Sequence, residues 1–94
     1  MAIRFPIQLI RGAALCDADL AILAAPPMRY LDYASGVRAE YAHVDGVAFT
    51  SGRTAVLRDL VSRQPLFATE YGRREFEQAA RSNIAKELSM LTMP

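Results

Sequence analysis

Prolines and glycines divide this chain into four segments, and each segment spaces its apolar residues as a helix does. The breaks fall at Gly12, Pro26-Pro27, Asp45-Gly46, Gly52 and Pro65. No stretch alternates apolar and polar residues over the length that a half-buried strand requires. The sequence therefore predicts an all-α fold, a small bundle of about four helices. Its 94 residues suffice for one small domain and not for two.

We expect the four helices to span approximately residues 17–24, 27–44, 52–63 and 70–90. Asp17, Thr50 or Ser51, and Thr69 are the N-cap candidates, because their side-chain oxygens can accept a free backbone N–H. Gly36 lies inside the second predicted helix, where it costs roughly 1 kcal/mol against alanine, and this cost suggests close helix packing. The residues predicted to face the core are Leu31, Ala34, Val37, Tyr41, Val44, Leu57, Leu60, Val61, Phe76, Ala80, Ile84, Leu88 and Leu91.

The composition excludes several classes of protein. The chain is 52% apolar and 22% charged, which is typical of a globular protein. A net charge of +1 gives no strong attraction to nucleic acid or to an anionic membrane surface. No apolar run approaches the roughly 20 residues that cross a bilayer. Cys16 is the single cysteine, so an intrachain disulfide is impossible, and we expect a cytoplasmic protein.

Two carboxylates, Asp17 and Asp19, stand in an otherwise apolar stretch. Acidic side chains seldom lie beside a core unless a partner compensates their charge, and a metal ion is one such partner. Helix capping explains the same residues without a metal. His43 is the only histidine, and we expect it near the end of the second helix, where the dipole favours a protonated imidazole. A metal or substrate contact is the alternative for His43.

A set of polar residues in the later helices completes the candidate cluster: Arg38, Glu40, Arg53, Arg81, Asn83 and Glu87. Carboxylates bind divalent cations, and guanidinium groups bind phosphate oxygens through two parallel hydrogen bonds. Such a set suits metal-assisted hydrolysis of a phosphoester. The same side chains could instead tie the helices together through Glu87, and Asn83 could bond a neighbouring backbone. Both interpretations stay open from the residues alone.

The order of the motifs carries a resemblance to a known family. The motifs are Asp17-Ala-Asp-Leu-Ala-Ile-Leu, Ala25-Pro-Pro, Arg29-Tyr30, Arg38-Ala-Glu-Tyr-Ala-His-Val, Phe49, Gly52-Arg53, Val56-Leu57 and Ala80-Arg-Ser-Asn-Ile-Ala-Lys-Glu-Leu. Together they resemble the C-terminal half of small bacterial proteins predicted to be metal-dependent phosphohydrolases of the HD superfamily. The resemblance covers residues 15–91, most of the chain. Ala24 departs from it, since the family usually has glycine at that place.

The resemblance implies a fold, a chemistry and a metal ligand. The superfamily is all-helical, and a histidine, a His-Asp pair and a distant aspartate hold its divalent metal, which could be Mn, Mg, Ni, Fe or Zn. Metal-activated water then hydrolyses a phosphate ester or a nucleotide. Carried onto this chain, Asp19 would be the distant metal ligand. Asp17 would either orient Asp19 without touching the metal or serve as an alternative ligand.

The remaining metal ligands of the family are absent from this sequence. No histidine precedes Asp17, and residues 1–12 do not resemble the family. We therefore expect residues 13–94 to form one helical domain that corresponds to the C-terminal half of an HD-like domain and is inactive alone. The missing N-terminal half or a second copy of the chain would be its partner. The alternative is a non-enzymatic helical interaction or dimerisation module, in which the aspartates only cap helices.

Overall fold

Helices make up the computed structural model, which describes residues 13–93. The elements are α2 (Ala13–Leu20), the 3-10 helix η1 (Ala21–Ala24), α3 (Pro27–Glu40), α4 (Gly46–Ser62), α5 (Glu70–Glu75) and α6 (Glu77–Leu91). No strand occurs within this described part of the chain, and the predicted all-α bundle is confirmed. None of its helices is both long and apolar enough to cross a lipid bilayer.

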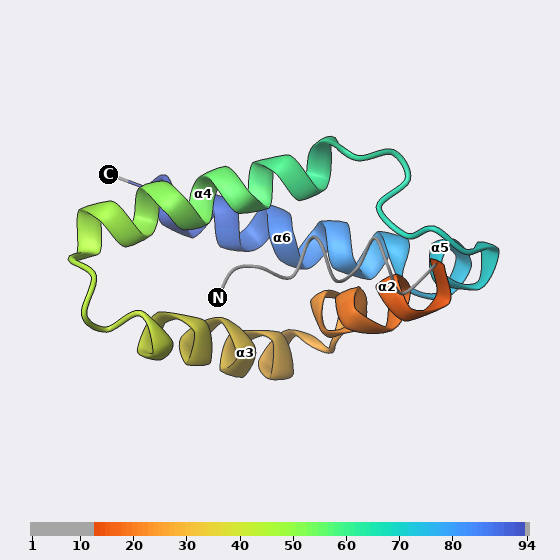
Figure 1. Cartoon of the computed structure of the whole chain (residues 1–94), viewed down its shortest axis with the longest axis horizontal. Coiled ribbons are helices and arrows are strands. Elements are labelled where there is room, and N and C mark those ends of the chain that lie inside the picture. The colour runs from red at the N-terminus through yellow and green to blue at the C-terminus, as the bar shows by residue number, and fades with distance from the viewer. Residues whose placement is uncertain (1–12, 94) are drawn as a thin grey trace.

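The helices form one bundle, in which α6 lies between α4 on one side and α2 and α3 on the other in this view (Figure 1). α4 and α6 pack side by side and run in opposite directions. η1 packs closely on α6, and the short α5 leads directly into α6. α3 lies across from α4 and α6, and its first turns are anchored mainly by η1. The chain therefore surrounds α6 with its other elements.

The core joins the predicted helical faces to two residues of a connecting segment. Leu57 and Leu60 of α4 and Ala80 and Ile84 of α6 are buried, as predicted from their spacing. Val61, Phe76, Leu88 and Leu91 are partly buried against them, which also agrees with the prediction. The remaining core residues are Leu23, Tyr30, Leu66 and Phe67. Leu66 and Phe67 were not predicted, because they lie between α4 and α5, where the spacing of a helix does not apply.

Several predicted helix ends are wrong. Asp17 lies inside α2 and is not its N-cap. α4 begins at Gly46, where Asp45 is the N-cap and accepts the Ala48 N–H at 2.9 Å, so the capping role predicted for Thr50 or Ser51 is wrong. Phe76 interrupts the predicted fourth helix and separates α5 from α6. The cap predicted at Thr69 is confirmed, because its hydroxyl accepts the Gly72 N–H.

The second predicted helix also differs from expectation. α3 ends at Glu40, so His43 lies in the following turn, is exposed, and cannot act at the end of the helix as predicted. Tyr30 is the buried residue of α3, whereas Leu31 is 47% exposed. Gly36 does not mark close packing, since no neighbouring atom lies within 4 Å of the place its Cβ would take.

Candidate functional site

Asp17 binds the backbone at the start of α5. Only 5% of its surface is exposed. Its Oδ1 accepts the Ala68 N–H at 2.7 Å, and its Oδ2 accepts the Thr69 N–H at 2.9 Å and the Thr69 hydroxyl. Burial alone would raise the pKa of Asp17, but these hydrogen bonds from Thr69 and Ala68 outweigh burial and lower it. Asp17 is therefore an ionised structural anchor that holds α2 to α5.

Gly72 makes room for this anchor. A Cβ at Gly72 would lie 2.9 Å from the Phe67 Cβ and would collide with the Asp17 carboxylate. Real Cβ atoms essentially never come this close to other atoms. The residue that faces Asp17 must therefore lack a side chain. The glycine thus has a packing role, which its place inside a helix would not suggest.

Glu77 anchors the same connecting segment from the other side. Its carboxylate accepts the N–H groups of Leu66 and Phe67 at 2.8 and 3.0 Å. Arg81 donates to Glu77 at 2.8 Å and also to the carbonyl oxygens of Val61 and Arg63. Burial would raise the pKa of Glu77, but the backbone hydrogen bonds and Arg81 lower it. We call Asp17, Glu77 and the backbone of residues 66–69 the acid clamp.

A second polar network joins α3, α4 and α6. Arg53 donates two hydrogen bonds to Glu87, at 2.8 and 2.9 Å, and the Tyr30 hydroxyl donates a third. The side chains of Arg53 and Glu87 are only 8% and 13% exposed. Arg53 also lies over the Tyr33 ring, 5.4 Å from its centroid. The predicted pairing of Arg53 with Glu87 is therefore confirmed. Tyr30 and Glu87 line a groove that is described below, and we call Tyr30, Arg53 and Glu87 the groove floor.

The groove floor shifts the pKa of its members. Burial would raise the pKa of Glu87, but the hydrogen bonds from Arg53 and Tyr30 and the charge of Arg53 keep it below the ordinary value. Burial and the neighbouring Glu87 carboxylate together raise the pKa of Tyr30. At neutral pH the Arg53 and Glu87 charges thus compensate one another, and Tyr30 stays protonated as a donor.

Asn83 fixes η1 to α6. Its amide nitrogen donates to the carbonyl oxygens of Leu23 and Ala25 at 2.9 and 2.8 Å. These carbonyls sit at the irregular junction before α3, where the backbone has no regular helical partners. The predicted bond from Asn83 to a neighbouring backbone is therefore confirmed.

Arg38 and Glu40 do not join the groove floor. Arg38 donates to the carbonyl oxygens of Tyr41 and Val44 at 3.1 and 3.2 Å, and its guanidinium lies 4.7 Å from the centroid of the Phe49 ring. It therefore stabilises the turn between α3 and α4. Glu40 is exposed, and no ion pair involves it within residues 13–93. The network expected to include these two residues is correct only for Arg53 and Glu87.

Asp19 lies near the end of α2 and is partly exposed. Two residues of α-helix turn the side-chain direction by about 200°, so Asp19 and Asp17 project from different sides of α2. In the part of the chain that the structure describes, histidine, cysteine and acidic side chains do not gather in threes around a possible metal position.

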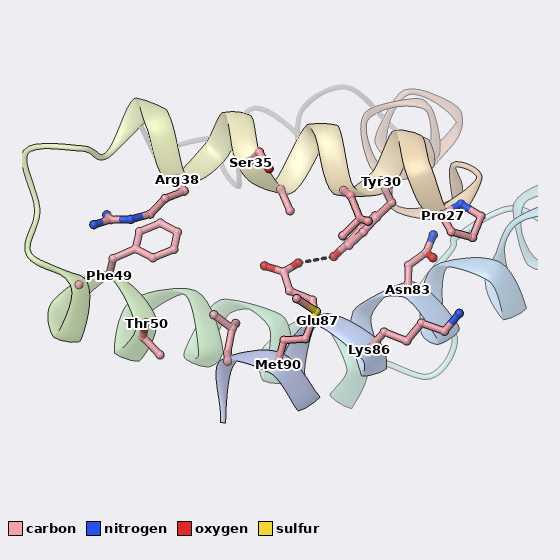
Figure 2. A pocket seen from close by; sticks show the side chains of 14 residues that line it. Pro27, Tyr30, Ser35, Arg38, Phe49, Thr50, Asn83, Lys86, Glu87 and Met90 are labelled. Carbon is pink, nitrogen blue, oxygen red and sulfur yellow. Dashed lines mark hydrogen bonds between the residues drawn. The ribbon is translucent and has the colours of Figure 1, made fainter. Parts of the chain in front are cut away.

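A groove lies between α3 and the pair α4 and α6 (Figure 2). Its volume is about 550 Å³. Three predicted site residues, Arg38, Asn83 and Glu87, line it, and the Tyr30–Glu87 hydrogen bond crosses its floor. Arg81 and both aspartates lie outside the lining. Glu40 and Arg53 lie outside the lining too, so the structure does not gather the predicted cluster around this groove.

Sequence reasoning missed several residues with polar roles. Glu77 completes the acid clamp, and Tyr30 completes the groove floor. Thr69 was predicted only as a cap, and its hydrogen bonds to Asp17 were missed. Glu77 had a detectable signal, because Arg81 follows four residues later and such pairs meet on a helix surface. The partners of Tyr30 and Asp17 are 57 and up to 52 residues away, and no local pattern indicates them.

No family model matches this sequence, and neither a curated protein nor a solved structure matches it. The relationship to the HD superfamily stays a prediction that depends on the motifs.

Proposed function

We propose that this chain is a helical part of a metal-dependent phosphohydrolase of the HD-superfamily type, in which Asp19 is one ligand of a divalent cation. The further ligands would come from a second segment or polypeptide. The cytoplasm would be its compartment, and the complete assembly would hydrolyse a small phosphate ester or a nucleotide. By itself the chain would turn over no substrate.

The division of roles between the two aspartates carries this proposal. Asp17 is committed to the N–H groups of Ala68 and Thr69, and a metal ion there would have to displace those bonds. Asp19 projects from another side of α2 and is partly exposed. The family resemblance implies Asp19 as the ligand, and the commitment of Asp17 to backbone N–H groups agrees with that assignment.

The anchoring of α2 gives the proposal a second support. Asp17 ties the middle of α2 to α5, and η1, which continues from α2, is tied to α6 through Asn83. Asp19 lies between these two anchors. A ligand held on a rigid element keeps its geometry when a partner brings the rest of the site.

Paramagnetic broadening by Mn²⁺ tests the role of Asp19. One carboxylate binds a cation weakly, so millimolar Mn²⁺ is needed, and amide signals close to the ion lose intensity. We expect the strongest broadening around Asp19 and its loss in Asp19→Asn. Asp59→Asn, which removes an exposed carboxylate of α4, is the matched control. Equal broadening at Asp19 and Asp59 would count against the proposal.

Hydrolysis of p-nitrophenyl phosphate tests whether the chain is incomplete. With Mn²⁺, Mg²⁺ or Ni²⁺ present, we expect the isolated chain to give no turnover above the metal alone. A robust rate that disappears in Asp19→Ala would show that the chain forms an active site without a partner.

A non-enzymatic dimerisation module is the second candidate, and one observation favours it. Large apolar side chains are exposed on α3, α4 and α6, namely Met28, Leu31, Val47, Val56 and Met90, and Met93 beyond the end of α6 is exposed as well. Apolar residues clustered on a surface often mark an association site. On this alternative, light scattering would give a dimer mass that Met28→Glu reduces, and Asp19→Asn would leave any response to metal unchanged.

A further inference from the structure

The groove between α3 and the α4–α6 pair combines an apolar wall with uncompensated positive charge. Leu31 and Ala34 line it from α3, Phe49 from α4, and Met90 and Leu91 from α6. In Figure 2, Tyr30 of α3 and Glu87 of α6 point toward one another across it. Its volume of about 550 Å³ falls within the range of roughly 300–1,000 Å³ that is typical of small-molecule sites.

The polar groups of the groove floor already have their hydrogen-bond partners and their charge compensation within the protein. Arg53 and Glu87 neutralise one another, and the Tyr30 hydroxyl is occupied by Glu87. No buried side-chain nitrogen or oxygen lacks a hydrogen-bond partner among the residues that the structure describes. A ligand that covers this floor with apolar atoms therefore leaves no polar group of the floor unpaired.

The rim of the groove carries two cations without acidic partners. Arg38 is held by backbone carbonyl oxygens and by the Phe49 ring, and neither removes its charge. Lys86 is exposed, and none of the ion pairs found within residues 13–93 involves it. Glu87 is the only acidic residue of the lining, and Arg53 compensates it. The groove thus has a positive electrostatic character.

We propose that this groove binds a small amphipathic anion, a molecule with an apolar body and one carboxylate or phosphate group. The apolar body would lie over the groove floor between Leu31 and Met90, and the anionic group would pair with Lys86. Charge complementarity selects this occupant, because a neutral apolar molecule would leave the rim charge unused and a cation would be repelled. The proposal is independent of the metal role of Asp19.

Titration of the full chain with sodium dodecanoate and dodecyl phosphate, each below its micelle concentration, tests the proposal by amide chemical shifts. We expect saturable one-to-one binding with shifts at groove residues, for at least one of the two head groups. Dodecyltrimethylammonium carries the same apolar body with the opposite charge, and acetate carries the charge without the body. Neither should produce these shifts.

Two substitutions locate the site. Lys86→Glu should weaken binding about fivefold or more, whereas Arg58→Glu, an exposed cation of α4 outside the lining, should leave it within twofold. Ser35→Phe, which places a ring in the groove, should abolish binding, whereas Ser51→Phe outside the lining should not. Circular dichroism confirms that each variant is folded.

Three results would overturn the proposal. The first is binding of the cationic amphiphile as tightly as the anionic ones. The second is an equal response of Lys86→Glu and Arg58→Glu. The third is the absence of saturable binding by either anion at millimolar concentration. Asp19→Asn should bind the anions as the unmodified chain does, so failure here and failure of the metal proposal are distinguishable.

Discussion

The acid clamp and the groove floor both depend on buried carboxylates, but the carboxylates have different partners. In the acid clamp, Asp17 and Glu77 accept backbone N–H groups of one connecting segment. In the groove floor, Glu87 accepts side-chain donors from α3 and α4. A backbone N–H group can bond a carboxylate only when the backbone itself lies close to it, so these hydrogen bonds hold residues 66–69 against the core. Long side chains instead span the distance between helices, which leaves a groove above them.

This comparison predicts where the molecule is most sensitive to mutation. Removing Glu87 from the groove floor leaves the buried Arg53 guanidinium unpaired, whereas removing Asp17 from the acid clamp leaves neutral N–H and hydroxyl groups unpaired. An unpaired buried charge costs more free energy than an unpaired amide. The groove floor should therefore produce the largest single effect, even though the acid clamp contains more hydrogen bonds to the backbone.

Glu87→Ala should lower the free energy of unfolding by about 3–5 kcal/mol. The substitution leaves Arg53 without its carboxylate in a position where its side chain is only 8% exposed. Urea denaturation measures the loss. Glu75→Ala, which removes an exposed carboxylate paired with Arg74, is the control and should cost at most about 1 kcal/mol.

A double substitution sharpens this prediction. Combining Glu87→Leu with Arg53→Met removes both charges, so it should be less destabilising than Glu87→Ala alone. If Glu87→Ala cost no more than Glu75→Ala, Arg53 would not depend on a buried partner, and the two regions would not differ as proposed.

Gly72→Ala should lower the free energy of unfolding by about 1–3 kcal/mol. The added methyl group would lie 2.9 Å from the Phe67 Cβ and would collide with the Asp17 carboxylate. Asp17→Ala removes the carboxylate that the new methyl group would meet. Gly72→Ala should therefore lower the free energy of unfolding by less in an Asp17→Ala background. Strictly additive effects of the two substitutions in thermal unfolding would contradict this coupling.

Acid should weaken both regions, because the pKa values of Asp17, Glu77 and Glu87 are all lowered by folding. A lowered folded-state pKa gives stability that is present above the unfolded value and lost as pH falls through the folded value. The ordinary pKa values are 3.8 for Asp and 4.5 for Glu. Stability should therefore stay level from pH 7 to about pH 5 and fall below about pH 4.5.

Urea denaturation at a series of pH values separates the contribution of Asp17. Asp17→Asn should cost about 1–2 kcal/mol at pH 7 and should show a shallower loss in acid. Asp59→Asn, on the exposed side of α4, controls for a change in net charge. An acid dependence identical in the Asp17→Asn and Asp59→Asn variants would show that the acid clamp does not carry the effect.

The parts of this fold that sequence could predict are the parts fixed by neighbouring residues. The cap at Thr69 and the buried face of Ala80 and Ile84 depend on spacing within a few residues, and both are confirmed. Asp45 was interpreted as a turn residue before glycine, but the same residue type is a preferred N-cap, and that role prevails. Local patterns therefore predicted the helices better than they predicted the helix ends.

The polar networks depend on contacts that are distant in sequence. Asp17 was expected to cap its own helix, but it binds α5, about 50 residues away. Arg53 and Glu87 were suspected of pairing, yet Tyr30, which completes their network, was not included in the candidate cluster. A carboxylate in the sequence indicates that a partner is needed, and only the fold decides which partner it is.

The substitution of Gly36 should have the smallest effect on stability, and its sign should be opposite to that of Gly72→Ala. Like Gly72, Gly36 lies in a helix, but no atom lies within 4 Å of the place its Cβ would take, and the residue is exposed. Gly36→Ala should therefore raise the free energy of unfolding by about 0.5–1 kcal/mol, because alanine restricts the unfolded chain and favours the helix. A thermal melt of this variant beside Gly72→Ala should give shifts of opposite sign. A loss of stability at both positions would mean that a neighbour packs against α3 at Gly36, and the two glycines would then not differ as proposed.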